Sequence, residues 1–493
     1  MQLQTISHKL KGAAADSLIL TFVKVVTAVL GLLTTKLLST QFSLSEYGTY
    51  SQAMLLASTI TSVSILGLTD ATNYFYNSAD DEERKRQNIA TVFGIQYIIG
   101  IFCGLLVCIA QAPIIQYFRN EELYKIIIFA AWMPIFNNLI PMLQVLFISI
   151  GKAKTIAIRN FMVSLLRLGF VALASFVTRN IRTVFVLLLI LDIAQVVYFY
   201  ISFSKNGFRI KLRDFRCKLV GPILNFSIPM AVYVFTSALS RDIDKYVISY
   251  FSDTQTLAIY TNAAKVLPFD MLAAAFLTVL VPIVTRQVRS ENYTDAQKTL
   301  KAYLRVGYLA TWILVVGAIV NAKEMMLLLY DKKYLSGLSV FVVYLFVDMF
   351  RFANMSLILA AKGKTKTLLK WSLISLVVNA ALNVVTYLTV GIIGPALSTL
   401  VVTIGLMLIY LSISAKEIST SIKELFDWRE VITEIVQLLV IGSIALVIKK
   451  LLYMFISSYV IVLLLNYVMF CGVMMLLNKP RLADCLKIIN QLK

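Results

Sequence analysis

Tyr50-Ser51-Gln52-Ala53 reappears in a loosely matching form as Tyr260-Thr261-Asn262-Ala263, 210 positions further along the chain. A second match at the same offset aligns Lys152, Lys154 and Thr155 with Lys362, Lys364 and Thr365. Two matches at one offset predict that the chain consists of two homologous halves. In helical membrane proteins, a two-fold repeat is the usual build of a secondary transporter, whose binding site lies where the repeats meet.

The composition predicts that lipid surrounds most of this chain. Of its 493 residues, 59% are hydrophobic and 15% are charged, whereas soluble domains are about 45–50% apolar and about 25% charged. This excludes the cytosolic and secreted soluble classes. The net charge of +20 comes from Lys and Arg in short loops between apolar segments. We therefore interpret it as a topology signal and a contact with anionic lipid, and we expect no nucleic-acid partner.

Metal and redox chemistry are not expected. The chain has five cysteines, none of which forms a CxxC pair, and its single histidine is His8. This pattern favours neither a disulfide framework nor a zinc site. We expect no cofactor.

Apolar runs predict fourteen transmembrane helices, because a bilayer core about 30 Å thick needs about 20 apolar residues per helix. The predicted spans are 14–38, 46–69, 88–111, 124–149, 156–178, 183–203, 219–250, 257–285, 299–322, 334–360, 367–390, 393–415, 431–450 and 455–477. The 210-residue offset pairs span 1 with span 7, span 2 with span 8 and span 5 with span 11. Each half therefore has six helices, and an even number makes the repeats parallel in the membrane.

The predicted organisation is an all-α polytopic membrane protein with two six-helix lobes. Its parts are an N-lobe at 1–203, a basic linker at 204–218, a C-lobe at 219–415, and two further helices with a tail at 431–493. Lys and Arg are three times as frequent on the side of the termini and the linker as on the other side. We therefore expect both termini and the linker to be cytoplasmic.

Basic residues inside the predicted spans mark the candidate substrate site, because a charge at bilayer depth costs at least about 2.5 kcal/mol on insertion scales. The five deepest are Lys24, Arg241, Lys245, Lys265 and Arg351. Arg241 and Lys245 are four residues apart and share one helix face. Such groups suit a phosphate or pyrophosphate anion. Lys36 and Arg305 lie nearer the ends of their spans and are expected to extend towards the interface.

Acidic residues inside the spans allow two interpretations. Asp244, Asp270 and Asp348 are candidates for carrying a coupling proton or sodium ion. The alternative is internal pairing, since Asp244 adjoins Lys245 and Asp348 lies three residues before Arg351. Gly363-Lys364-Thr365 resembles the end of a nucleotide-binding loop, but Ile358 stands where that pattern needs a glycine. We therefore expect an ion gradient or the substrate's own gradient to drive transport.

Three features of the chain share a pattern with a known family. They are the segment 42–53 after the first span, the Gly-Lys turn after span 4, and Arg241-Asp242-Ile243-Asp244-Lys245 in span 7. They resemble bacterial polysaccharide-biosynthesis membrane proteins, the Wzx-type oligosaccharide flippases of the multidrug/oligosaccharidyl-lipid/polysaccharide exporter superfamily. The resemblance covers the whole chain, including the predicted number of helices.

The resemblance implies a transporter rather than an enzyme, with two lobes that open alternately to each side of the bacterial inner membrane. Its substrate would be an undecaprenyl-pyrophosphate-linked oligosaccharide for O-antigen, capsule or exopolysaccharide. The five deep basic residues would contact the pyrophosphate or the sugars. Membrane lipid and other polysaccharide assembly proteins would be its further partners.

Three alternatives stay open at this point. A cation-coupled multidrug exporter of the same fold usually has twelve spans and an acid-rich pocket. A lipid II flippase of the same superfamily fits the pattern as well. A membrane-embedded polysaccharide polymerase or ligase usually carries a large periplasmic loop, whereas the loops predicted for the outer side are short.

Overall fold

The computed structural model describes residues 23, 25–206, 208–353 and 356–484, and every regular element in these residues is helical. This confirms the predicted all-α class. The chain divides into two compact units, residues 1–242 with 249–258 and residues 243–248 with 259–493. Helices α9 (Cys217–Phe251) and α10 (Thr254–Ala263) contribute residues to both units.

Eleven helical stretches of the described residues are long and apolar enough to cross a membrane. They are Leu44–Asn77, Glu82–Ile109, Ile127–Ser149, Thr155–Thr178, Ile181–Lys205, Cys217–Phe251, Tyr293–Val320, Lys332–Arg351, Thr365–Glu417, Trp428–Phe455 and Tyr459–Leu477. The chain is therefore a multi-pass membrane protein, while the count of fourteen spans stays a prediction.

The fourteen spans predicted from the sequence and the eleven stretches found in the structure differ at three places. Predicted span 1 lies largely outside the described residues, and its described part is the shorter apolar helix Val25–Gln41. Predicted spans 11 and 12 fall within the single stretch Thr365–Glu417, although a 3-10 turn at Gly391–Ile393 separates its two helices. Predicted span 8 (257–285) is wrong as a continuous helix.

The chain leaves helical conformation after Ala263 and resumes at a 3-10 turn, Pro268–Asp270, before α11 (Met271–Arg289). Pro268 explains the break, because proline lacks an N–H and disfavours helical conformation in the residue before it. A hydropathy count cannot detect this break, since the residues on both sides are apolar.

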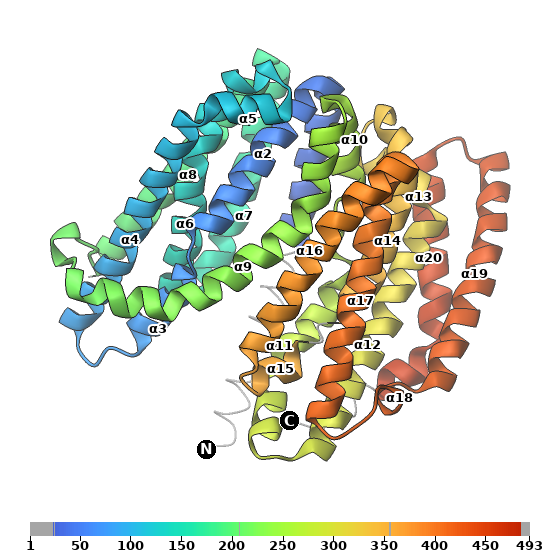
Figure 1. Ribbon diagram of the computed structural model, residues 1–493. Coiled ribbons are helices and arrows are strands. Elements are labelled where there is room, and N and C mark those ends of the chain that lie inside the picture. The colour runs from blue at the N-terminus through green and yellow to red at the C-terminus, as the bar shows by residue number, and fades with distance from the viewer. Residues whose placement is uncertain (1–22, 24, 207, 354–355, 485–493) are drawn as a thin grey trace, which may run out of the picture. The chain divides into compact units, whose positions relative to one another are not determined.

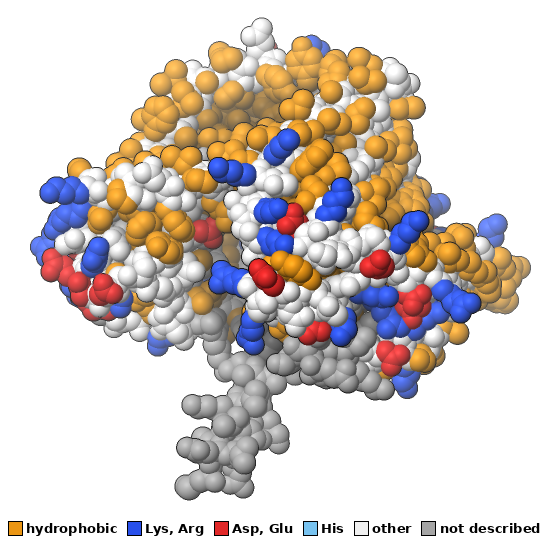
Figure 2. Space-filling model, turned by 60° about the horizontal axis from the view of Figure 1, so that its bottom comes forward, with side chains coloured by type: hydrophobic (Ala, Val, Ile, Leu, Met, Phe, Trp, Pro, Cys, Tyr) orange, Lys and Arg blue, Asp and Glu red, His pale blue; other side chains and the backbone are white. Residues whose placement is uncertain are grey.

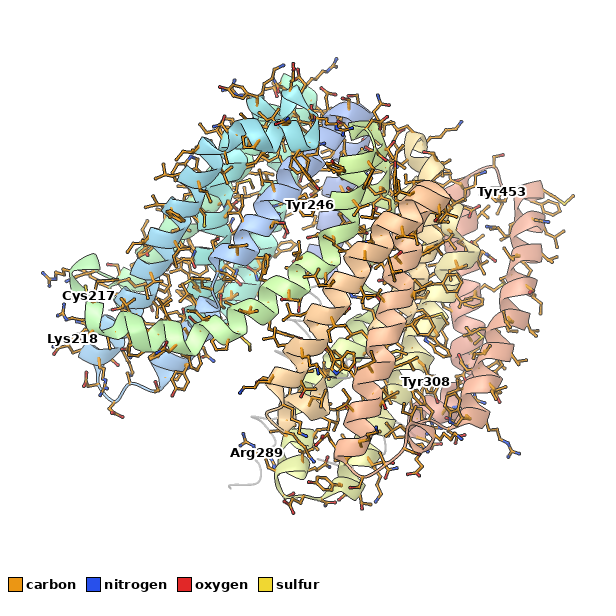
Figure 3. All side chains as sticks on the ribbon, viewed as in Figure 1. Cys217, Lys218, Tyr246, Arg289, Tyr308 and Tyr453 are labelled. Carbon is orange, nitrogen blue, oxygen red and sulfur yellow. The ribbon has the colours of Figure 1, made fainter. Side chains whose placement is uncertain are left out.

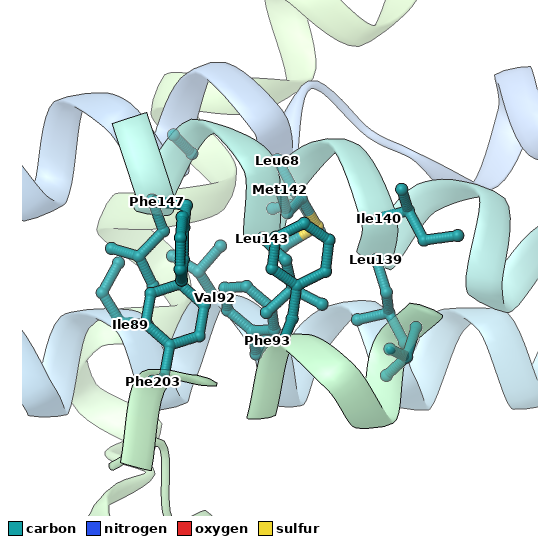
Figure 4. Packing of buried hydrophobic residues seen from close by; sticks show 14 of the residues in the cluster. Leu68, Ile89, Val92, Phe93, Leu139, Ile140, Met142, Leu143, Phe147 and Phe203 are labelled. Atoms are coloured by element: carbon teal, nitrogen blue, oxygen red, sulfur yellow. The ribbon is translucent and has the colours of Figure 1, made fainter. Parts of the chain in front are cut away.

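Helix α6 is at the centre of the first unit, where it packs against α2, α3, α4 and α8 (Figure 1). The helices of this unit that precede α9 are α2 (Leu44–Ser64), α3 (Leu68–Asn77), α4 (Glu82–Ile109), α5 (Gln111–Phe118), α6 (Ile127–Ser149), α7 (Ala153–Leu173) and α8 (Ile181–Lys205). Figure 4 shows the apolar core that forms around α6, including Leu143, Phe147 and Phe203. The Phe147 and Phe203 rings lie 5.0 Å apart in an edge-to-face arrangement. Close packing of this kind holds helices together in a lipid solvent that is itself apolar.

The segment 42–53 begins α2 with a capping box. The Ser43 hydroxyl accepts a hydrogen bond from the Glu46 amide (3.2 Å), and the Glu46 carboxylate accepts one from the Ser43 amide (2.9 Å). These bonds satisfy backbone donors that have no partner within the helix. Gly48 lies so close to α10 that an added Cβ would come within 2.6 Å of Thr254 Cγ2. The motif therefore fixes both the start of α2 and its contact with α10.

The second unit is organised around α12, which packs against α11, α14, α19 and α20. The helices of this unit after α11 are α12 (Tyr293–Val320), α13 (Ala322–Leu329), α14 (Leu338–Arg351), α15 (Leu357–Ala361), α16 (Thr365–Val390), α17 (Gly394–Glu417), α18 (Ile422–Leu425), α19 (Trp428–Phe455) and α20 (Tyr459–Leu477). Short 3-10 or π turns occur at Glu121–Lys125, Ala174–Thr178, Leu212–Asp214 and Lys332–Gly337.

Two polar contacts attach α19 to the rest of the second unit. At one end, Arg305 Nε donates to Glu430 Oε2 at 2.7 Å, and Tyr308 donates to the same oxygen. At the other end, Lys449 and Tyr453 both donate to the Glu324 carboxylate. Figure 3 labels Tyr308 of α12 and Tyr453 of α19, which belong to the contacts at opposite ends of α19. The α19 helix supplies Arg305 with an acidic partner, Glu430, and leaves the Arg305 side chain 17% exposed. The expectation that this side chain extends towards the interface stays a prediction.

Candidate functional site

The structure describes six of the eight predicted site residues with their side chains. Lys24 lies outside the described residues, and the side chain of Asp270 is not described either. Arg241 belongs to the first unit, where its side chain is exposed. The other five, all in the second unit, are Asp244, Lys245, Lys265, Asp348 and Arg351.

Asp244 is the acceptor at the centre of a buried hydrogen-bond network in the second unit. It is 1% exposed, and its Oδ2 accepts hydrogen bonds from the hydroxyls of Tyr260 (2.8 Å) and Tyr344. Its Oδ1 accepts one from the backbone amide of Lys245 at 2.8 Å. Removing a carboxylate from water is costly unless hydrogen bonds replace those of the solvent. Three donors meet that requirement here and join α9, α10 and α14.

Asp348 binds the helix break that follows α10. It is 3% exposed, and its Oδ2 accepts a hydrogen bond from the Leu267 amide at 3.0 Å. Leu267 directly precedes the 3-10 turn that begins at Pro268, so a side chain serves as the acceptor for its amide. Interrupted membrane helices expose backbone groups in this way, and transporters commonly place ion and substrate sites beside them.

One face of α14 carries both contacts. Tyr344 and Asp348 are four residues apart and therefore lie on the same side of the helix. Through Tyr344 this face binds Asp244 of α9, and through Asp348 it binds the break that contains the half-buried Lys265. Arg351 follows at the exposed end of α14. One face of α14 thus binds both Asp244, which the Lys245 backbone amide also contacts, and the helix break in which Lys265 lies.

The sequence analysis missed both tyrosines of this network. Tyr260 belongs to the repeated motif, and Tyr344 lies one helical turn before Asp348. A buried acid needs donors, so a tyrosine four residues from an intramembrane aspartate was the available signal.

A second polar cluster lies inside the first unit, between α7 and α8. Asp192, 1% exposed, accepts a hydrogen bond from Gln195 Nε2 at 3.0 Å and lies 3.9 Å from an Arg167 nitrogen. Arg159 donates to Gln195 and lies over the Phe199 ring, 4.6 Å from its centroid. The sequence analysis missed Arg159 as a candidate, since it lies three residues from the predicted start of span 5. Gln195 therefore links Asp192 to Arg159, while Arg167 approaches Asp192 directly from α7.

The Gly-Lys turn of the second unit is held by ion pairs. After α15, Lys362 and Lys364 both form ion pairs with Glu417 at the end of α17, and Lys362 also lies 4.5 Å from the Tyr293 ring centroid. Burial lowers the pKa of Lys362, but hydrogen bonds to Tyr293 and Glu417 outweigh it and hold that pKa above its ordinary value. In the first unit, Gly151 and Lys152 are exposed. The ion pairs with Glu417 therefore attach the turn after α15 to the end of α17.

The sequence of this chain matches the model of a known protein family. The model for polysaccharide biosynthesis proteins matches residues 37–339, more than half of the chain. The chain belongs to the polysaccharide biosynthesis protein family. The matched region includes Asp244, Tyr260 and the helix break after α10, but not Tyr344 or Asp348.

A curated relative and two solved structures support the same placement for this family member. Over 223 residues the chain is 22% identical to "Probable lipid II flippase MurJ" of Rickettsia prowazekii (strain Madrid E), an alignment that spans 43% of each protein. In fold it resembles "Lipid II flippase MurJ, inward closed conformation", with a TM-score of 0.71 and 18% identity over 94% of this chain and 99% of that one. A multidrug resistance MATE family transporter of the MOP superfamily gives a TM-score of 0.61 and 14% identity over 80% of this chain and 96% of that one. The predicted family is thus confirmed by the family model, and the two solved structures show that this chain has their fold.

Proposed function

We propose that this protein is a flippase that moves an undecaprenyl-pyrophosphate-linked oligosaccharide repeat unit across the bacterial cytoplasmic membrane by alternating access. The observation that carries the proposal is the family match over residues 37–339. The flippase fold over 94% of the chain supports it. The repeat unit would serve the assembly of O-antigen, capsule or exopolysaccharide.

The substrate class follows from the charges within the helices. Arg241 is exposed on α9, Arg351 is exposed at the end of α14, and Lys265 lies in the helix break. Together with Lys245 and Lys24, these residues are our candidates for contacts with the pyrophosphate and the sugars. Guanidinium groups bind phosphate oxygens in a two-pronged arrangement that no neutral side chain reproduces. A cationic drug would be repelled by the same groups.

The ion-coupling role falls to the acidic residues of the second unit. Asp244 and Asp348 each accept hydrogen bonds that join α14 to a neighbouring element, and Asp270 lies at the end of the helix break. Adding a proton or sodium ion to Asp244 would weaken its hold on Tyr260 and Tyr344. Such a change would alter the packing of α14, and a coupling ion can act only through a differential interaction of this kind.

The test is gradient-driven flipping by the purified protein in liposomes. The inner leaflet carries the undecaprenyl-pyrophosphate oligosaccharide, and an external glycosidase reports the glycan that becomes accessible. We expect accessibility to rise faster with an imposed proton or sodium gradient than without one. Export of small cationic dyes with no exposure of any glycan would refute the proposal.

Lipid II is the second candidate substrate, because the curated relative is named as a lipid II flippase. Liposomes loaded with lipid II provide the direct comparison. Preference for the oligosaccharide over lipid II supports the proposed substrate, and the reverse preference replaces it.

A further inference from the structure

A basic cavity lies apart from the residues discussed so far. It has a volume of about 160 Å³ and lies between the first two turns of α4 and the segment that joins α8 to α9. Five basic side chains line it: Arg86, Arg209, Lys211, Arg213 and Arg216. The acidic side chains in its wall are Glu83 and Asp214, which leaves an excess of three positive charges. One water molecule takes about 30 Å³ in the liquid, so the cavity has room for a small polyatomic anion.

We propose that this cavity binds a phosphate group, carried either by an anionic lipid or by a small ion in solution. None of the candidate substrate-binding or ion-coupling residues lines this cavity, so a phosphate group could bind here whatever the transported substrate is.

Packing against α4 fixes the wall that the linker contributes. The Arg216 amide donates a hydrogen bond to Thr91 Oγ1 at 3.1 Å. Phe215 packs against Gly94 so closely that an added Cβ would lie 2.5 Å from Phe215 Cδ2. These two contacts come from the neighbouring linker residues Phe215 and Arg216. They hold the adjacent basic residues beside α4. The cavity is thus formed by packed structure and not by a free loop.

The guanidinium groups of the wall are oriented but retain free donors. Arg209 Nε donates to Ser204 Oγ at 3.1 Å, and one nitrogen of Arg216 donates to the carbonyls of Arg213 and Phe215. Each guanidinium has five N–H donors, so most of them stay available. Preorganised donors lose less conformational freedom on binding a ligand.

Internal acids do not neutralise this charge. In the described part of the chain, Arg86, Arg209, Lys211 and Arg216 form no ion pair with a carboxylate. Arg213 lies 3.9 Å from Asp214, at the limit of a pair, and Glu83 accepts a hydrogen bond from Gln87. The four cations without an acidic partner therefore favour an external anion.

The chemistry and the location favour phosphate. Arginine forks match the oxygens of a phosphate group. The Arg213 side chain is 78% exposed, so the cavity is open to an approaching headgroup. Figure 2 shows Lys and Arg side chains gathered, with a few acidic ones, at the left edge of the face drawn, where Figure 3 labels Cys217 and Lys218. Basic pockets of this kind beside membrane helices bind anionic lipid headgroups.

Binding by the purified full-length protein in detergent tests the proposal. Inorganic phosphate, short-chain phosphatidylglycerol and short-chain phosphatidylcholine are added in separate series, and binding is measured by native mass spectrometry and by the shift in unfolding temperature. The test variant is the triple substitution Arg86→Gln, Arg209→Gln and Arg213→Gln. The matched control is Lys205→Gln with Lys218→Gln, which removes charge from exposed positions of the same linker outside the cavity.

We expect the triple variant to bind phosphatidylglycerol at least tenfold more weakly than wild type, while the Lys205/Lys218 control changes less than twofold. Binding of phosphatidylglycerol alone identifies a lipid as the source, and additional binding of inorganic phosphate identifies the free ion. Equal loss in the control and the triple variant would overturn the proposal, since it would show non-specific surface attraction. Binding of none of the probes would overturn it as well.

A second variant guards against a folding defect. Arg86→Lys, Arg209→Lys and Arg213→Lys keep the charge but lose the guanidinium fork. We expect this variant to unfold at the wild-type temperature without ligand and to bind more weakly than wild type. Unchanged affinity in the lysine variant would contradict the proposed fork contacts.

Discussion

Tyr260 donates a 2.8 Å hydrogen bond to Asp244, whereas its counterpart in the first repeat, Tyr50, has its ring centroid 5.5 Å from that of Phe185. The 210-residue offset places Thr34 opposite Asp244, and the Thr34 hydroxyl donates to the backbone carbonyl of Leu30. The same tyrosine of the repeated motif therefore serves apolar packing in one half and binds a buried acid in the other. At the aligned positions 34 and 244, the acid therefore occurs only in the second half of the predicted repeat.

The Asp244→Asn variant tests the coupling role of this acid. The asparagine oxygen can still accept from the two tyrosines, although its NH2 group cannot accept from the Lys245 amide as Asp244 Oδ1 does. The amide cannot take up a proton or hold a cation by charge. We expect the protein to insert and fold, with a loss of at most about 1–3 kcal/mol of stability, and to lose the gradient dependence of flipping. Asp242→Asn, on the same helix, is the control and should keep that dependence. A gradient response that survives in Asp244→Asn would remove Asp244 from the coupling role.

The Tyr344→Phe variant tests whether the network holds α14. Loss of the Tyr344 hydroxyl leaves the buried Asp244 carboxylate with one donor fewer, which costs about 1–3 kcal/mol. A double-mutant cycle with Asp244→Ala, which removes the acceptor, should give a coupling energy of about 0.5–3 kcal/mol, because the two side chains are in direct contact. Unfolding in a graded denaturant series measures both values. A coupling energy near zero would show that the hydrogen bond contributes nothing to stability.

The pair formed by Arg305 and Glu430 should attach α19 to α12. We expect Arg305→Ala to lower stability by about 1–3 kcal/mol, since Glu430 then keeps a half-buried charge with Tyr308 as its one side-chain donor among the described residues. Arg429→Ala, at an exposed neighbouring position, is the control and should change stability by less than about 0.5 kcal/mol. The double variant Arg305→Ala with Glu430→Ala should be more stable than Arg305→Ala alone. Equal effects at Arg305 and Arg429 would refute the anchoring role.

Gly48 and Gly31 form a matched pair for the close approach of α2 to α10. Gly48→Ala places a Cβ against Thr254, and overpacking of this kind costs about 1–3 kcal/mol. Gly31→Ala meets nothing within 4 Å and should be neutral or stabilising by up to about 1 kcal/mol, as alanine favours helices. The unfolding temperature of each variant gives the answer. A stable Gly48→Ala protein would show that the two helices can separate without loss.

Much of this architecture could be predicted from the sequence, because lipid imposes long apolar helices and makes intramembrane charges rare. Asp244 and Asp348 were identifiable for that reason. Their partners were not, since the Leu267 amide becomes a donor only where Pro268 interrupts a helix, and hydropathy does not register that break. The partner of Arg305 was not identifiable either, because Glu430 lies 125 positions away on another helix. Sequence spacing does not reveal such contacts.

The most direct test of the central claim is the rate at which inner-leaflet undecaprenyl-pyrophosphate oligosaccharide becomes accessible to an external glycosidase in proteoliposomes. It is measured for wild type, for Arg241→Ala and for Lys205→Ala as an exposed control of equal charge. The account predicts gradient-dependent exposure in wild type and in Lys205→Ala, and none above protein-free liposomes in Arg241→Ala at equal reconstitution. Exposure in Arg241→Ala at the wild-type rate would exclude Arg241 from the substrate site, and no exposure in wild type with any gradient would contradict the flippase function itself.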